Sequence, residues 1–148
     1  MLIEDSFEVS VSPDDVWALF MDIPRVSACL PGVESVEETS PDHYQGVLKV
    51  KVGPISASFD GQVEILERQD NQRRIVAQVV GKDAISSTTV KAVFTSEVMP
   101  SDVGARVDFG IDVALRGRLA TFGSAVVKGT AKKMTAEFSR CVQEALAV

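Results

Sequence analysis

The feature that most constrains the fold of this chain is a long stretch of period-two alternation. From about residue 33 to residue 116, apolar and polar residues alternate along successive short runs. In the clearest run, PISASFDGQVEIL, every odd-numbered residue from Ile55 to Ile65 is apolar or small, and the even-numbered residues between them are polar. This is the pattern of strands with one buried face. Turn-forming segments such as RQDNQ and PSDVG separate the runs. Sequential strands joined by short turns predict an antiparallel meander.

Helical segments are predicted on both sides of this stretch. After a first strand, SFEVSV, the segment SPDDVWALF offers Ser12 as an N-cap and Pro13 at the first helical position. A second, short helix is predicted around Pro24 to Leu30. After Gly117 the apolar period returns to 3.6, which predicts one helix of about 30 residues that runs to the C-terminus.

This order of elements predicts an α+β fold. A single long amphipathic helix has to bury its apolar face against the one large sheet available. A twisted sheet offers a concave face wider than one helix can fill. Small residues at expected inward positions, such as Ala57, Gly61 and Ala92, favour a hollow interior, although a fully packed core stays open as an alternative. We therefore predict one domain over residues 1–148, with a curved antiparallel sheet of about seven strands wrapped around the C-terminal helix.

Composition and charge argue against several classes of partner. The 148 residues carry a formal net charge of −6 and no basic cluster, which disfavours nucleic acid and anionic membrane surfaces. No apolar run approaches the roughly 20 residues that a bilayer crossing needs, so no transmembrane segment is predicted. The N-terminus MLIEDSFEVS lacks the features of a secretory signal. The chain is expected to be cytoplasmic.

The sequence offers little chemistry for catalysis or metal binding. Cys29 and Cys141 lie far apart and are expected to be reduced thiols that behave as small buried hydrophobes. The only histidine, His43, lies in a probable turn and has no neighbouring ligand residue, which makes a metal site improbable. No nucleophile motif, phosphate loop or dinucleotide motif is present. We predict no catalytic residues, no metal and no cofactor.

Several charged residues are expected on surfaces. Arg116 and Arg118 flank Gly117 and are expected to serve the turn and the helix start, or alternatively to hold an acidic partner or a ligand headgroup. Lys132 and Lys133 are assigned to the exposed face of the last helix. Four carboxylates are expected on the solvated face of the sheet: Asp60, Glu64, Asp108 and Asp112.

Four stretches carry a resemblance to a known family. They are SPDDVWALFMDIPRVSACLPGVESVE, YQGVLKVKVGPISASFDGQVEILER, GRLATFGSAVVKGTAKKM and EFSRCV, and together they extend from near the N-terminus into the last helix. In these stretches the sequence closely resembles the CoxG family, which is named after the G subunit of carbon monoxide dehydrogenase. The resemblance implies the helix-grip fold that START-type lipid-transfer domains, plant pathogenesis-related class 10 proteins and aromatase/cyclase domains share.

The resemblance also implies a function. It predicts a non-catalytic accessory protein that binds a lipophilic small ligand, with a quinone as the candidate, and serves a carbon monoxide dehydrogenase-type molybdenum hydroxylase in assembly, recruitment or electron-acceptor delivery. Membrane-attached relatives have a longer C-terminal tail, so direct anchoring is in doubt here, and any peripheral membrane location is expected to come through a partner. Two alternatives stay open: an assembly module without a physiological ligand, and a cyclase-type enzyme.

Strand parity and helix phase predict the residues that line the ligand site, and the fold that the resemblance implies would make the segment MDIPRVSACLPGV a lid over it. The prolines of this segment would turn its short helices across the mouth of the pocket; alternatively, they only end short packing helices. The predicted lid residues are Met21, Pro24, Val26, Pro31, Gly32 and Val33. The predicted lining residues are Phe20, Leu30, Ile55, Ala57, Phe59, Gly61, Phe94, Phe109, Ile111, Leu119, Phe122, Gly123, Val126 and Met134.

Overall fold

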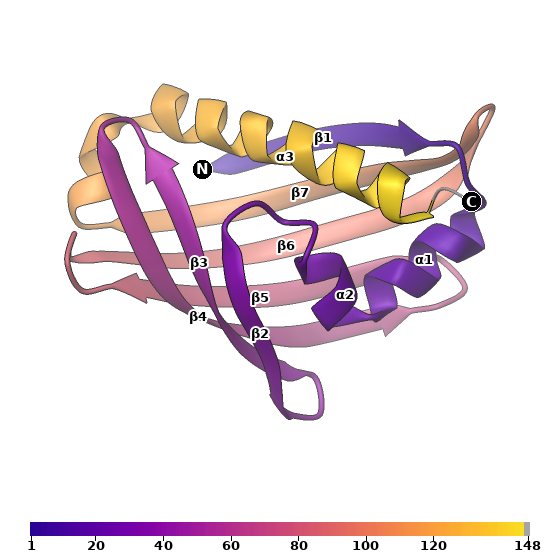
Figure 1. Cartoon of the computed structure of the whole chain (residues 1–148), viewed down its shortest axis with the longest axis horizontal. Helices are drawn as coiled ribbons and strands as arrows, with labels where there is room; N and C mark the ends of the chain where they lie inside the picture. Colours follow the sequence, from indigo (N-terminus) through magenta and orange to yellow (C-terminus); the bar gives the residue numbers. More distant parts are fainter. Residues whose placement is uncertain (147–148) are drawn as a thin grey trace.

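The computed structural model describes residues 1–146 and shows one sheet with helices against it (Figure 1). Neighbouring strands pair antiparallel in the order β1-β7-β6-β5-β4-β3-β2. The meander and the seven strands predicted from the alternation are therefore confirmed. The elements in chain order are β1 (Leu2–Val9), α1 (Pro13–Met21), α2 (Ile23–Ser27), β2 (Val33–Ser40), β3 (His43–Val52), β4 (Ile55–Gln69), β5 (Arg74–Asp83), β6 (Thr88–Ser101), β7 (Gly104–Arg116), η1 (Arg118–Phe122) and α3 (Ser124–Leu146).

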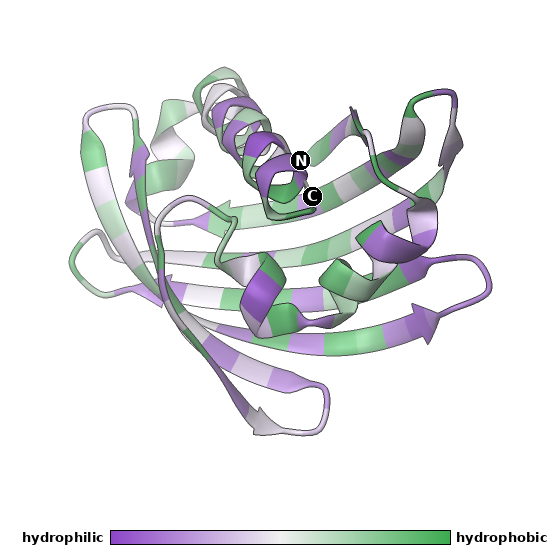
Figure 2. Cartoon of the chain, turned by 45° about the vertical axis from the view of Figure 1, so that its right-hand side comes forward, coloured by the Kyte–Doolittle hydropathy of each residue, from purple (hydrophilic) through white to green (hydrophobic). Residues whose placement is uncertain are grey.

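The alternation of side chains gives the sheet two distinct faces. We call the side that faces α3 the inner face and the opposite side the outer face. Apolar and polar residues alternate visibly along the strands in Figure 2. In β6 and β7, for example, Val98 and Val107 are paired and buried on the inner face, whereas the neighbouring Arg106 is exposed. Period-two patterning thus places one face of each strand toward the helix.

Helix α1 begins as the sequence predicts. The Ser12 hydroxyl caps it by accepting a hydrogen bond from the Asp15 backbone N–H at 3.1 Å, and Pro13 occupies the first helical position. An N-cap of this kind satisfies one of the free N–H groups of the first turn. The helix buries one side against β6 and β7. Its buried residues are Val16, Trp17, Leu19 and Phe20.

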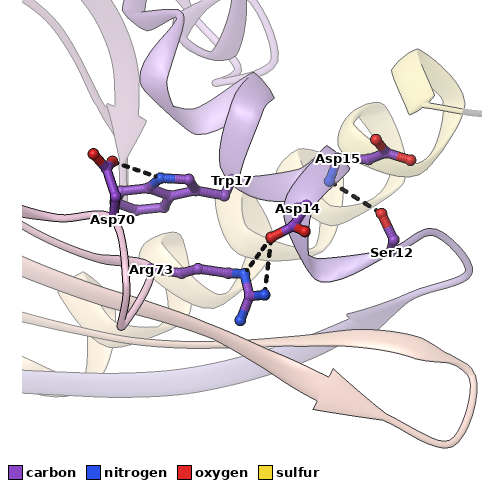
Figure 3. A network of polar contacts seen from close by, with 6 residues as sticks. All are labelled: Ser12, Asp14, Asp15, Trp17, Asp70 and Arg73. Carbon is purple, nitrogen blue, oxygen red and sulfur yellow. Dashed lines mark hydrogen bonds and ion pairs between the residues drawn. The ribbon is translucent and has the colours of Figure 1, made fainter.

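Polar contacts fasten α1 to the turn between β4 and β5 (Figure 3). The Trp17 indole Nε1–H donates to the Asp70 carboxylate at 3.0 Å. The Arg73 guanidinium forms an ion pair with Asp14, with Nη2 2.8 Å from Oδ1. The indole contact lets a large aromatic side chain be buried without leaving its N–H group unpaired. Helix α1 is therefore a fixed part of the structure.

The C-terminal helix is shorter than predicted. Instead of one helix of about 30 residues, a 3₁₀ segment, η1, precedes α3, which begins at Ser124 and spans 23 described residues. Gly117 and Gly123 flank η1 with φ angles of 101° and 83°. These left-handed conformations are compatible with glycine but not with a continuous helix. The apolar period continues through the break, which is why periodicity alone did not reveal it.

The expectation of reduced thiols is wrong, because Cys29 and Cys141 form a disulfide. Their Cα atoms lie 5.3 Å apart although 112 residues separate them in sequence. The bond joins the segment that follows α2 to the last turns of α3. Arg25 reinforces this junction by donating from Nη2 to the Ala145 carbonyl oxygen at 3.3 Å. Sequence spacing did not reveal the pair because only the folded chain brings α2 against the end of α3.

The buried core is divided into two clusters at opposite ends of α3. The η1 cluster lies where β3, β4 and η1 meet and contains Val52, Ala57, Phe59 and Leu119. The α1 cluster joins α1, the end of α3 and the strands beneath them, and contains Val9, Val16, Trp17, Leu19, Phe20, Cys29, Tyr44, Ile65, Ile75, Ala77, Val98, Ala105, Val107 and Val142.

Candidate ligand-binding face

The inner face between the two clusters is the candidate site. Helix α3 makes its main backbone approaches to β1 and β3, which lie toward opposite margins of the sheet. Figure 1 shows the sheet passing beneath the helix between these margins. A sheet that curls around one helix leaves its central strands farther from the helix axis than its margins. The inward-pointing side chains of β4 to β7 therefore determine how the space between the helix and the sheet is filled.

Several predicted lining residues gather at the η1 end. Ala57, Phe59 and Leu119 are buried in the η1 cluster, and Ile55 and Phe122 pack against it. The structure thus brings these five residues together in one packed cluster. Their contacts close this end of the inner face.

An aromatic cluster on the inner face adjoins the α1 cluster, of which Phe20 is a member. The Phe94 and Phe109 rings stack with their centroids 6.1 Å apart, and Phe7 lies 6.4 Å from Phe109. Phe138 of α3 contacts Phe7 edge-to-face at 6.0 Å and Phe20 of α1 at 6.1 Å. Sequence reasoning placed Phe20, Phe94 and Phe109 in the site but omitted the other two. Phe138 could have been found from the helical repeat, and Phe7 from the alternation of the first strand.

Several predicted lining residues keep some exposure although they point inward. Phe94, Phe109, Ile111 and Met134 are all half-buried, unlike the fully buried side chains of the two clusters. Gly61 lies on the inner face in the same row as Gly81 and Val90, toward the η1 cluster, and a methyl group added there would meet no atom closer than 3.7 Å. These inward-pointing side chains are therefore less buried than those of a uniformly packed core would be.

Three other predicted lining residues lie outside the two clusters. Gly123 is exposed in the break before α3, and an added methyl group there would meet nothing within 4 Å. Val126 is 36% exposed at the start of α3. Leu30 is half-buried in the segment between α2 and β2. The assumption of a continuous helix put Gly123 and Val126 in the wrong phase.

The predicted lid segment lies beside the α1 cluster. Met21 ends α1, and both Met21 and Val26 pack against this cluster. None of the five described residues of α2 is buried. Gly32 has a φ of 89° and lies against the Lys49 carbonyl oxygen, where any side chain would clash. Val33 is the first residue of β2. Pro24 is exposed and Pro31 half-buried.

One inward-facing polar side chain lacks a partner. Ser96 of β6 is 1% exposed, and its hydroxyl has no hydrogen-bond partner among residues 1–146. It is paired with Ile75 on one side and with Phe109 on the other, and it follows Phe94 by two positions on the same face. Sequence reasoning did not select it. The sequence feature that could have identified it is a serine at an inward position between the apolar residues Phe94 and Val98.

A buried polar network holds the turn between β5 and β6 against η1. The Asp83 carboxylate accepts hydrogen bonds from the Ser86 hydroxyl at 2.7 Å and from the Ile85 backbone N–H at 3.2 Å. The Ser86 Oγ atom also lies 2.9 Å from the Thr88 Oγ1 atom, which accepts the Leu119 backbone N–H at 3.3 Å. The Ser86 hydrogen bond is the main reason why the pKa of Asp83 is lower than its ordinary value. The network fixes η1 and hence the closed end of the inner face.

The two largest described hollows lie on the outer face, and Phe109 is the one predicted lining residue among those that border them. One, of about 640 Å³, has Gly110 at its centre, the exposed Leu2 and Val93 beside it, and carboxylates around it. The other, of about 290 Å³, lies over β3, β4 and β5. The first is lined by Leu2, Glu4, Arg74, Val93, Thr95, Glu97, Asp108, Phe109, Gly110 and Asp112.

Charged residues lie where the sequence indicated. Asp60, Glu64 and Asp112 are exposed on the outer face, and the half-buried Asp108 pairs with Arg106 at 2.7 Å. Arg116, Arg118, Lys132 and Lys133 are all exposed.

His43 begins β3 instead of lying in the turn. Its Nδ1 atom lies 2.9 Å from the Pro41 carbonyl oxygen. Within residues 1–146, no group of three or more acidic, cysteine or histidine side chains is placed to hold a metal ion. No helix in that range is long and apolar enough to cross a membrane.

Comparison with protein families decides the family. The model of the family of carbon monoxide dehydrogenase G subunits (CoxG) matches residues 6–147. The chain belongs to the CoxG family. A comparison with curated proteins found no match.

Solved structures confirm the fold of this CoxG chain. A conserved protein from Geobacillus kaustophilus superposes with a TM-score of 0.89 at 21% identity, covering 99% of this chain and 95% of that one. A START superfamily protein from Mycobacterium smegmatis gives 0.73 at 11% identity, covering 98% and 96%. The ZhuI aromatase/cyclase from Streptomyces sp. R1128 gives 0.71 at 14% identity, covering 98% and 92%. At these identities the likeness shows the helix-grip fold alone.

Proposed function

We propose that this CoxG chain is a non-catalytic accessory protein that binds a lipophilic small molecule on the inner face, with a quinone as the candidate. It would serve a carbon monoxide dehydrogenase-type molybdenum hydroxylase in assembly, recruitment or delivery of an electron acceptor. Family membership supports the accessory role. The observation that carries the ligand is the aromatic cluster, whose Phe94 and Phe109 rings stay half-buried although they point toward α3. Ligand sites are typically apolar, with few polar groups.

Titration with decylubiquinone, followed by equilibrium dialysis, tests the ligand. Gly61→Leu would place a bulky side chain on the inner face, where an added Cβ meets no atom closer than 3.7 Å, and we expect it to abolish binding. Val93→Asp changes an exposed side chain on the outer face and should leave binding unchanged. Thermal unfolding of both variants checks that they fold. Equal binding by wild type and Gly61→Leu would contradict an inner-face site.

One observation favours a second candidate, an assembly module that docks a partner protein. The outer-face hollow of about 640 Å³ combines the exposed Leu2 and Val93 with surrounding carboxylates, which is the kind of surface a docking patch requires. If this module is the function, Val93→Asp should weaken capture of the hydroxylase from a lysate of the native host, and Gly61→Leu should not. The inner-face proposal predicts no loss of quinone binding in Val93→Asp.

A further inference from the structure

We propose that the Ser96 hydroxyl is the polar anchor of the inner-face ligand. It would donate a hydrogen bond to an oxygen carried on a planar, otherwise apolar ring, such as a quinone carbonyl. The inference rests on the proposed function and goes beyond it by naming the contact and the ligand chemistry.

The first argument is the cost of the unpaired hydroxyl. Ser96 is 1% exposed and has no hydrogen-bond partner in the part of the chain that the structure describes. A buried polar group without a partner destabilises a protein, whereas alanine at the same position would carry no such cost. An inward-facing serine among apolar neighbours is therefore poorly suited to the ligand-free protein. A ligand oxygen would supply the missing acceptor.

The second argument is what surrounds the hydroxyl. Across the strands Ser96 is paired with Ile75 and Phe109, and Phe94 and Val98 are its neighbours on the same face of β6. The stacked Phe94 and Phe109 rings lie beside it and are half-buried. Aromatic rings contact other flat rings favourably through offset or edge-to-face packing. One hydrogen-bond donor beside such rings matches a flat apolar molecule that carries an oxygen.

The third argument concerns ligand charge. The four residues around Ser96 are all apolar, so a charged headgroup would be buried here without a counter-charge, which is costly. A neutral carbonyl needs only the one donor that the serine supplies. A hydrocarbon of the same shape would fit but would leave the hydroxyl unpaired. The Ser96 hydroxyl therefore favours a ligand that carries an oxygen over a hydrocarbon ring of the same shape.

Two probes that share one carbon skeleton separate the contribution of the ligand oxygen from that of the ring. Menadione and 2-methylnaphthalene differ only in the two ring carbonyl groups of menadione. In equilibrium dialysis we expect wild-type protein to favour menadione over 2-methylnaphthalene roughly 3- to 10-fold more than Ser96→Ala protein does, which is the contribution of one neutral hydrogen bond. Ser96→Ala should reduce the preference by weakening menadione binding alone. The same substitution should raise the melting temperature of the ligand-free protein, because it removes an unpaired buried hydroxyl.

Ser101 supplies a matched control. Its hydroxyl is also buried and unpaired within residues 1–146, but it lies at the end of β6 beside the turn to β7. Ser101→Ala should leave the affinity for both probes unchanged. If Ser96→Ala keeps the wild-type preference for menadione, the anchor is wrong and the inner-face site stands. If wild-type protein binds neither probe, the proposed site and the anchor both fail.

Discussion

At the scale of single residues, a lowered carboxyl pKa makes a prediction about acid stability. The pKa of Asp83 lies below its ordinary value of 3.8, chiefly because the Ser86 hydroxyl donates to the carboxylate. A lowered folded-state pKa adds stability that is fully present above pH 3.8 and is lost as the pH falls through the folded-state pKa.

Asp83→Asn should therefore lower the melting temperature by several degrees at pH 7, and the difference from wild type should shrink below pH 3.8. Thermal unfolding followed by circular dichroism between pH 2 and pH 7 measures both effects. Asp60→Asn, at an exposed outer-face position, is the control and should change little. A constant difference across this pH range would contradict the charge-dependent network.

Two glycines provide a pair of opposite predictions. At Gly117 the φ is 101° and an added Cβ would clash with the Ser87 carbonyl oxygen, so Gly117→Ala should lower the free energy of unfolding by about 2–4 kcal/mol. Gly129 lies inside α3 with nothing within 4 Å of an added Cβ. Gly129→Ala should therefore raise the free energy of unfolding by about 0.5–1 kcal/mol. Urea denaturation of both variants measures the pair. Similar effects of the two substitutions would contradict this account of the turn.

At the residue scale, the sequence predicted what local chemistry determines. The Ser12 cap and Pro13 were recognisable because capping acts over three or four residues. The unpaired Ser96 was not recognised, because its lack of a partner depends on strands that lie far away in sequence. The alternation indicated that Ser96 points to the inner face, but it did not indicate that the side chain is fully buried.

At the scale of elements, the disulfide between the α2 segment and α3 makes the strongest prediction. In the chain-entropy model, a cross-link closing a loop of about 100 residues stabilises a protein by up to about 5 kcal/mol, with about 2–4 kcal/mol typical. We expect reduction with dithiothreitol to lower the free energy of unfolding by about 2–5 kcal/mol in urea titrations. Cys29→Ser/Cys141→Ser should behave like the reduced protein and be insensitive to reductant. Equal midpoints with and without reductant would contradict a stabilising disulfide.

Elements that local interactions define could be predicted from the sequence, whereas features that depend on distant parts of the chain could not. The strands were predictable because their alternation and turns are local, and their sequential pairing then fixed most of the sheet order. The break at Gly123 was not, since the apolar period continues across it. The disulfide joins elements at opposite ends of the chain, so only the fold could reveal it.

At the scale of the whole molecule, the two faces of the sheet have different characters. The inner face carries the aromatic cluster and the unpaired Ser96, both beside the α1 cluster. The outer face carries the carboxylates and the hollow around Gly110. Sequence parity predicted this division, but it did not predict that the core would separate into two clusters. The proposed ligand role is assigned to the inner face and the alternative docking role to the outer face, so variants of each face test the two proposals separately.

The central claim is that this CoxG chain binds a lipophilic molecule. The most direct measurement is mass spectrometry of an organic-solvent extract of the protein purified from its native host, with denatured protein as the control. We predict a near-stoichiometric apolar compound that carries a ring oxygen and is absent from the control. A clean extract from folded, monodisperse protein would contradict the ligand role and favour the assembly module.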